Sequence, residues 1–150
     1  MKLIIAGTRP PAYILKNVKK YAEWMILLKR RVLSIGTINY LKTTARDGWV
    51  IIDHYAFTEI VSGNAFGPDH LGEIIASLFY IPVKKFPADW KTHGKAAGMI
   101  RNREMAEHAD ELYLVWDGKS SGSRNMKEEM IKREKPVHEL VIKDWTLGVK

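Results

Sequence analysis

Two glycine-rich turns in the sequence carry the residue types that bind phosphate. The first, Ser62-Gly63-Asn64, lies between an apolar run with β-branched residues and Pro68, a residue suited to the first position of a helix. Glycine permits a positive φ and a close approach of the backbone to a ligand. The free N–H groups and the positive dipole end of the following helix would face this turn, so an anion is its natural occupant. The alternative is a tight strand-to-helix connection without a ligand.

The second turn, Asp117–Ser123, follows another apolar run and has the sequence DGKSSGS. Its hydroxyl and backbone N–H groups can hold oxyanions. Gly118-Lys119-Ser120 is similar to the end of a P-loop, but Tyr113 stands where the first P-loop glycine is required. The same stretch also fits the G-x-S-x-G pattern of a nucleophile elbow, yet no histidine follows Asp144 to complete a hydrolase triad in the required order. A phosphate-binding loop is therefore the preferred interpretation.

Four side chains between these turns have the chemistry to contact a nucleotide. Arg101 and Asn102 begin a predicted helix, where a guanidinium can pair bidentately with phosphate or carboxylate. Trp90 can stack on a base, and Asp89 can accept a hydrogen bond from a ribose hydroxyl. The alternatives are a solvated helix end for the arginine, a packing role for the tryptophan and turn capping for the aspartate.

The elements that must position these residues alternate between strands and helices. Apolar runs predict strands at 2–6, 59–61, 81–86, 111–116 and 136–142. Helical spacing and context predict helices at 12–32, 68–79, 99–109 and 123–134. This alternation implies right-handed βαβ units and a mostly parallel sheet covered on both faces. We therefore expect an α/β protein, a Rossmann-like three-layer sandwich, with its ligand at the carboxyl ends of the strands.

The composition fits one globular domain spanning residues 1–150, with 29–57 as a possible insertion or lid because residues 34–47 within it show no clear period. The chain has no cysteine, and its five histidines show no paired ligand spacing, so we expect no metal or other cofactor. A formal charge of +7 favours anionic partners but is also met in ordinary basic surfaces. No apolar run is long enough to span a bilayer and no signal peptide is recognisable, so we expect a cytoplasmic protein without membrane contact.

Taken together, the motifs resemble the SLOG superfamily, which joins the Smf/DprA DNA-processing proteins and the LOG-type, lysine decarboxylase-like nucleotide hydrolases. The resemblance is closest to its YspA/cpYpsA-related branch. It rests on ordered blocks outside 29–57: AGTR at 6–9, VSGNAFGPD at 61–69, FPADW at 86–90, GKAAG at 94–98, RNREM at 101–105 and WDGKSSGS at 116–123. The resemblance implies a Rossmann-like domain, found as a homodimer, whose glycine loops bind a nucleotide or nucleotide-derived small molecule such as an ADP-ribose-like ligand.

The turns and the matched blocks together define the candidate ligand-binding residues. They are Gly7, Thr8, Arg9, Ser62, Gly63, Asn64, Gly67, Asp69, Asp89, Trp90, Arg101, Asn102, Gly118, Lys119, Ser120, Gly122 and Ser123. Arg101 also matches the arginine in the R-K-x-x-M segment of the LOG-type hydrolases.

Two departures from the family pattern separate the functional hypotheses. Phe66 stands where the family usually has arginine, which weakens the case for single-stranded nucleic-acid binding of the DprA type. Met126 stands at the position of the LOG-type catalytic glutamate, while Trp116 and Asp117 replace a proline and a glycine, so no catalytic residue is assigned. Binding of a nucleotide-derived molecule is therefore the leading hypothesis. Nucleic-acid binding and nucleoside-monophosphate phosphoribohydrolase activity are the alternatives, and we expect little or no release of free base.

Overall fold

The centre of the fold is a five-stranded sheet in which every neighbouring pair is parallel. The computed structural model describes residues 2–34, 44–46, 49–51, 58–65, 67–78 and 80–145. In spatial order the strands are β5 (Val83–Lys85), β4 (Glu59–Ser62), β1 (Lys2–Gly7), β6 (Glu111–Trp116) and β7 (Val137–Val141). This arrangement confirms the expected parallel α/β sheet.

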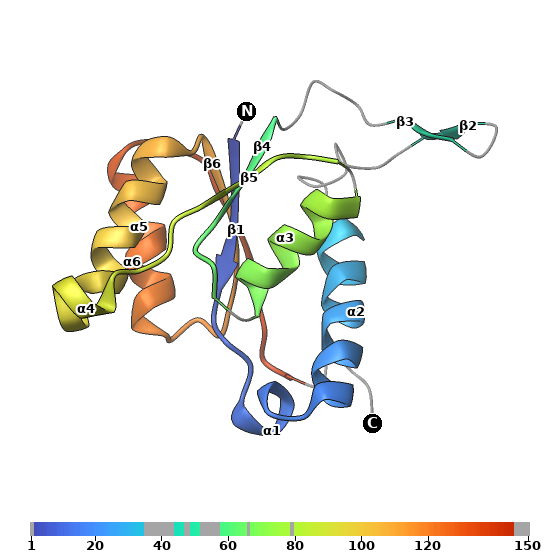
Figure 1. The fold of residues 1–150 in the computed structure, drawn as a ribbon, viewed down its shortest axis with the longest axis horizontal. Coiled ribbons are helices and arrows are strands. Elements are labelled where there is room, and N and C mark those ends of the chain that lie inside the picture. The colour runs from blue at the N-terminus through green and yellow to red at the C-terminus, as the bar shows by residue number, and fades with distance from the viewer. Residues whose placement is uncertain are drawn as a thin grey trace.

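Helices cover both faces of this sheet and give three layers (Figure 1). On the face covered by α2 (Val18–Ser34) and α3 (Pro68–Leu78), the buried strand residues are Leu3, Ile5, Ile60, Tyr113 and Val115. On the face covered by α5 (Ala97–His108) and α6 (Ser121–Lys132), they are Ile4, Ala6, Val61, Leu112 and Leu114. Consecutive strand residues point to opposite faces, and parallel strands are commonly apolar on both. The Rossmann-like sandwich is therefore confirmed.

The connections that follow the neighbouring strands β1 and β6 lie on opposite faces of the sheet. After β1 it enters the short helix α1 (Ala12–Leu15) and then α2, on one face, whereas after β6 it enters α6, on the other (Figure 1). β1 and β6 are hydrogen-bonded neighbours, with Gly7 opposite Val115 at their carboxyl ends. Such a point, where the connections diverge, opens a crevice in which α/β proteins bind ligands.

Several predicted elements differ from the observed ones. The single helix expected over 12–32 is divided into α1 and α2, because Asn17 Oδ1 accepts a hydrogen bond from Lys20 N at 3.0 Å and starts a new helix. Residues 87–98, between the predicted strand at 81–86 and the predicted helix at 99–109, contain helix α4 (Trp90–His93) and a 3₁₀ turn. Within 29–57, α2 continues to its end and β2 (Thr44–Arg46) pairs antiparallel with β3 (Trp49–Ile51). The rest of the predicted insertion or lid lies outside the described residues.

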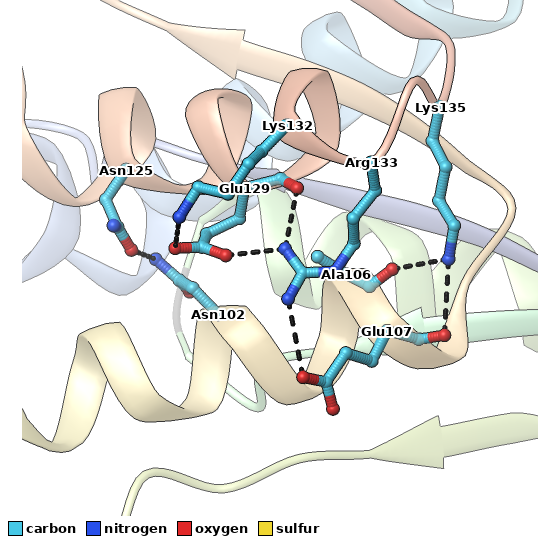
Figure 2. A network of polar contacts seen from close by, with 8 residues as sticks. All are labelled: Asn102, Ala106, Glu107, Asn125, Glu129, Lys132, Arg133 and Lys135. Atoms are coloured by element: carbon cyan, nitrogen blue, oxygen red, sulfur yellow. Dashed lines mark hydrogen bonds and ion pairs between the residues drawn. The ribbon is translucent and has the colours of Figure 1, made fainter.

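A polar network joins α5 to α6 (Figure 2). Arg133 Nη1 donates to Glu129 Oε2 at 2.6 Å, and Arg133 Nη2 reaches Glu107 Oε1 on α5 at 3.3 Å. Lys135 Nζ donates to the carbonyl of Ala106 at 2.6 Å near the carboxyl end of α5. Charge-assisted bonds of this kind are stronger than neutral ones. They hold α5 and α6 in a fixed relation, which matters because both helices line the site.

None of the helices among the described residues has the length and apolar character needed to cross a membrane.

We expect Gly7→Ala to destabilise the fold by about 3 kcal/mol or more, because overpacking against rigid backbone cannot relax. A Cβ on Gly7 would lie 1.6 Å from the carbonyl oxygen of Val115. Urea unfolding of the variant measures the loss. Gly122→Ala is the matched control, since a Cβ there meets nothing within 4 Å and should change stability by less than about 1 kcal/mol. Equal stability of the two variants would contradict the close contact of β1 with β6.

Candidate functional site

A cavity of about 640 Å³ opens at the carboxyl ends of β1 and β6, where the connections diverge. Its walls come from the end of β1, the loop after β6, the first turn of α6, and helices α4 and α5. The volume lies within the range of small-molecule sites. The predicted site residues that line it are Gly7, Thr8, Arg9, Asp69, Trp90, Arg101, Asn102, Lys119, Ser120, Gly122 and Ser123.

The other predicted site residues lie outside the lining. They are Ser62, Gly63, Asn64, Gly67, Asp89 and Gly118. Asp89 Oδ1 instead accepts a hydrogen bond from Thr92 N at 3.1 Å and caps α4, which is the alternative role expected for it. Gly118 has a φ of +80°, which suits glycine in the turn that leads to α6.

The backbone amides of the first glycine turn are already bound within the chain. Asn64 N donates to Ser62 Oγ at 3.1 Å, and Gly67 N donates to Tyr21 Oη at 2.9 Å. Ala65 N donates to Asp69 Oδ2 at 3.4 Å, so a carboxylate of the chain itself occupies the amino end of α3. Phe66, the departure from the family pattern, lies outside the described residues. Among the described residues of this turn, the amides of Asn64, Ala65 and Gly67 are therefore not free to hold a phosphate.

The second turn leaves the amino end of α6 uncapped. Asp117 Oδ1 accepts from Lys119 N and Ser120 N, both at 2.8 Å, and orders the turn. Ser120 occupies the N-cap position, but its side chain makes no capping hydrogen bond; its Oγ lies 2.7 Å from Thr8 Oγ1 instead. The first amides of a helix have no partner within the helix. At Ser121–Ser123 they therefore remain available to a ligand in the cavity.

The pKa of Asp117 agrees with its place in this turn. Desolvation raises the pKa, but the amides of Lys119 and Ser120 outweigh desolvation and hold the pKa below its ordinary value. Asp117 is therefore ionised at neutral pH and fixes the loop that precedes α6.

Basic side chains outnumber acidic ones around the cavity. The basic residues in the lining are Arg9, Lys95, Arg101, Lys119 and Arg124, and the acidic ones are Asp69 and Glu128. A concave surface with an excess of one charge concentrates ligands of the opposite charge. The cavity therefore favours anions.

Asp69 and Arg101 converge on Gly63 at one end of the cavity. A Cβ on Gly63 would lie 2.6 Å from Asp69 Oδ2 and 2.8 Å from Arg101 Nη1, so a side chain at this position would displace these two groups. Asp69 is only 7% exposed. Burial raises its pKa from 3.8 to about 6, against the opposing effect of the Arg101 guanidinium.

The neighbouring residues Arg101 and Asn102 connect the two glycine turns. Arg101 Nη1 donates to the carbonyl of Gly63 at 2.6 Å. Asn102 Nδ2 donates to the carbonyl of Gly122 at 3.1 Å and to Asn125 Oδ1 at 3.0 Å (Figure 2). One turn of α5 therefore fixes the distance between the Asp69 end of the cavity and the amino end of α6.

Several lining residues were not among the sequence candidates. They include Lys95, Gly98, Met99, Ser121, Arg124, Asn125, Met126 and Glu128. Residues 121, 124, 125 and 128 share one face of α6 at helical spacing, and that spacing was the signal that could have identified them. Trp90 is 56% exposed, and a Cβ on Gly98 would lie 3.5 Å from its ring. An exposed aromatic ring therefore lies at the cavity wall beside α5.

Comparison with known proteins gives one informative match. The chain is 33% identical over 84 residues to the "Gene 61 protein" of Mycobacterium phage D29, and the match covers 52% of this chain and 67% of that protein. The name of this relative states no activity. No family model matches the chain, and no solved structure matches it.

We expect Asp69→Asn to become more stabilising, relative to the wild type, as the pH rises. The pKa of Asp69 is higher in the folded than in the unfolded chain, so the ionised carboxylate lowers stability progressively between about pH 4 and pH 6. Arg101 and Arg9 lower this pKa, whereas Glu73 and burial raise it. The free energy of unfolding of the variant minus that of the wild type should increase by roughly 1–3 kcal/mol between pH 4 and pH 7.

Urea unfolding at several pH values measures this difference. Asp89→Asn is the control, because the pKa of that exposed carboxylate is lowered by Thr92 and its removal should give no gain as the pH rises. A difference for Asp69→Asn that stays flat with pH would show that Asp69 is not held in a desolvated position.

Proposed function

The chain belongs to the same protein family as the Gene 61 protein of Mycobacterium phage D29, and we propose that it binds a nucleotide or nucleotide-derived small molecule in the cavity between β1 and β6. The observation that carries this proposal is the uncapped amino end of α6 in the cavity wall. The relative's name states no activity, so support for nucleotide binding comes from the chemistry of the cavity.

A phosphate group at the first turn of α6 fits the groups that surround it. The amides of residues 121–123 and the hydroxyls of Thr8, Ser120 and Ser123 supply hydrogen-bond partners. The helix dipole adds positive potential at the same point, and Lys119 and Arg124 add full charges. The second turn is therefore the proposed phosphate site, in preference to the first turn, whose amides already have partners.

An aromatic base fits the part of the cavity wall that α4 and α5 supply. Trp90 and Met99 line the cavity, and both are more than half exposed. Exposed aromatic side chains beside a charged groove serve as stacking surfaces for bases, with little preference for sequence. This arrangement supports a ligand that carries both a base and a phosphate, which is the minimum description of a nucleotide.

The remaining parts of the family expectation belong to the same proposal. The parallel Rossmann-like sheet and the position of the cavity agree with membership of the SLOG superfamily. The homodimer that the resemblance implies, and the cytoplasmic location expected from the apolar pattern of the sequence, belong to this proposal.

We expect Gly122→Asp to weaken phosphate binding while it preserves the fold. A carboxylate in the first turn of α6 stabilises the helix but repels a phosphate at the same amides. Space is available, because a Cβ on Gly122 meets nothing within 4 Å. Calorimetry with ribonucleoside 5′-monophosphates and ADP-ribose should show affinity reduced at least about tenfold, or about 1.4 kcal/mol, relative to Gly122→Asn.

Gly122→Asn is the matched control because it has the same size without the charge. Equal affinity of the two variants for every ligand that the wild type binds would place the phosphate away from α6.

A second candidate function is hydrolysis of the N-glycosidic bond of a nucleoside monophosphate, and the position of Glu128 favours it. Glu128 lines the cavity, whereas the carboxylate of Glu129 accepts bonds from Arg133 and Lys132 in the network between α5 and α6. Met126 lines the cavity at 2% exposure and offers no carboxylate. Glu128 is thus the acidic residue of α6 that faces a ligand in the cavity.

We nevertheless expect binding without turnover, because Glu128 is exposed and a misplacement of about 1 Å can reduce a rate ~100-fold. Chromatographic assay for free base from AMP and CMP should give no release above background. Release that Glu128→Gln abolishes and Glu129→Gln preserves would overturn this expectation and establish Glu128 as the catalytic carboxylate.

A further inference from the structure

Two parts of the cavity lining differ in their hydrogen-bonding chemistry. The part at α6 presents donors: the first-turn amides, the hydroxyls and the neighbouring cations. A second part, near Gly63, presents a buried carboxylate, Asp69, beside the guanidinium of Arg101. A ligand that contacts both parts must therefore carry an anionic group for the first and a hydrogen-bond donor for the second.

Asp69 has acceptor capacity that the described part of the chain leaves unused. An ionised carboxylate offers about four lone-pair sites. Among the described residues, only Ala65 N donates to the Asp69 carboxylate, over a long 3.4 Å. A carboxylate that is 7% exposed and so poorly satisfied is costly unless a further donor reaches it.

A hydroxyl group of a ligand can bind to both Asp69 and Arg101. A hydroxyl can donate to the carboxylate of Asp69 and accept from an N–H of Arg101 at the same time. A phosphate dianion has no proton to donate, and beside Asp69 it would meet a like charge in a poorly solvated place. The Asp69 carboxylate, an acceptor, and the Arg101 guanidinium, a donor, therefore favour a polyol over a second phosphate.

We propose that Asp69 binds the ribose hydroxyls of the ligand and makes the cavity selective for ribonucleotides. This inference rests on the proposed function and adds the sugar to it: the phosphate lies at the first turn of α6, and the ribose lies against Asp69 and Arg101. The spacing is set by α5, since Arg101 bonds to Gly63 and Asn102 bonds to Gly122. The sequence had assigned the ribose to Asp89, whose carboxylate caps α4 outside the cavity lining.

Matched pairs of ligands test the inference directly. Calorimetry at pH 8, where Asp69 is ionised, compares AMP, GMP, CMP and UMP with their 2′,3′-dideoxy forms. Each pair keeps base and phosphate and differs only in the sugar hydroxyls. A site built to bind a hydroxyl rejects the analogue that lacks it. For each base that binds, the dideoxy form should bind the wild type at least about tenfold more weakly.

The same pairs with Asp69→Ala identify the residue responsible, and the preference should fall to less than about threefold. Asp69→Asn, which keeps the side-chain size, serves if the alanine variant does not fold, because a neutral amide oxygen accepts more weakly and should also reduce the preference. The comparison of ribose and dideoxyribose forms on the wild-type protein tests the selectivity even if neither variant folds. Asp89→Ala should keep the full preference.

Three results would overturn the inference. They are equal binding of ribose and dideoxyribose forms by the wild type, a full preference retained by Asp69→Ala, and a preference lost only in Asp89→Ala. Absence of binding by all eight compounds would overturn the proposed function as well. Binding without discrimination would leave the phosphate site at α6 standing and remove only the role of Asp69.

Discussion

The parallel pairing of β1 with β6 is the constraint on which the site depends. Gly7 lies so close to Val115 that no side chain fits between them, and Thr8 N donates to the Val115 carbonyl at 3.0 Å. The two strands therefore end together, and the chain leaves them toward opposite faces of the sheet. The loops after β1 and β6 meet as a result, and Thr8 contacts Ser120 and Ser123 across the opening. The cavity is a consequence of this topology.

The two glycine turns differ in whether their backbone amides already have hydrogen-bond partners within the chain. Around the first glycine turn, Tyr21, Ser62 and Asp69 accept the amide protons, so that turn is closed by the chain itself. Around the second turn, Asp117 orders the loop but the first turn of α6 is left uncapped. Helix ends without a cap need a partner from outside the helix. The same backbone chemistry thus gives a structural turn at one end and a proposed phosphate site at the other.

Local patterns were sufficient for the fold, whereas the role of each turn depended on contacts distant in sequence. The strand at 111–116 was predicted at its observed bounds because its apolar run is uninterrupted. The boundary between α1 and α2 was missed because the side chain of Asn17 restarts a helix inside a continuous apolar pattern. For the first turn the sequence left two alternatives, an anion site and a connection without a ligand, because Tyr21, which accepts from Gly67 N, lies 46 positions away. Asp89, in contrast, caps α4 by accepting from the amide of Thr92 three positions away, which is the alternative role that its local sequence predicted.

The proposed phosphate site consists of individual backbone amides, and the NMR signal of each amide can be observed separately. In a 17.2 kDa protein, ¹⁵N-resolved NMR follows each backbone amide during titration with a nucleotide that binds. The largest shifts are predicted for Ser121, Gly122 and Ser123, with small shifts at Asn64, Ala65 and Gly67, whose amides are already bonded. Large shifts at Asn64–Gly67 with an unaffected α6 would contradict the account, because they would place the phosphate at the first turn.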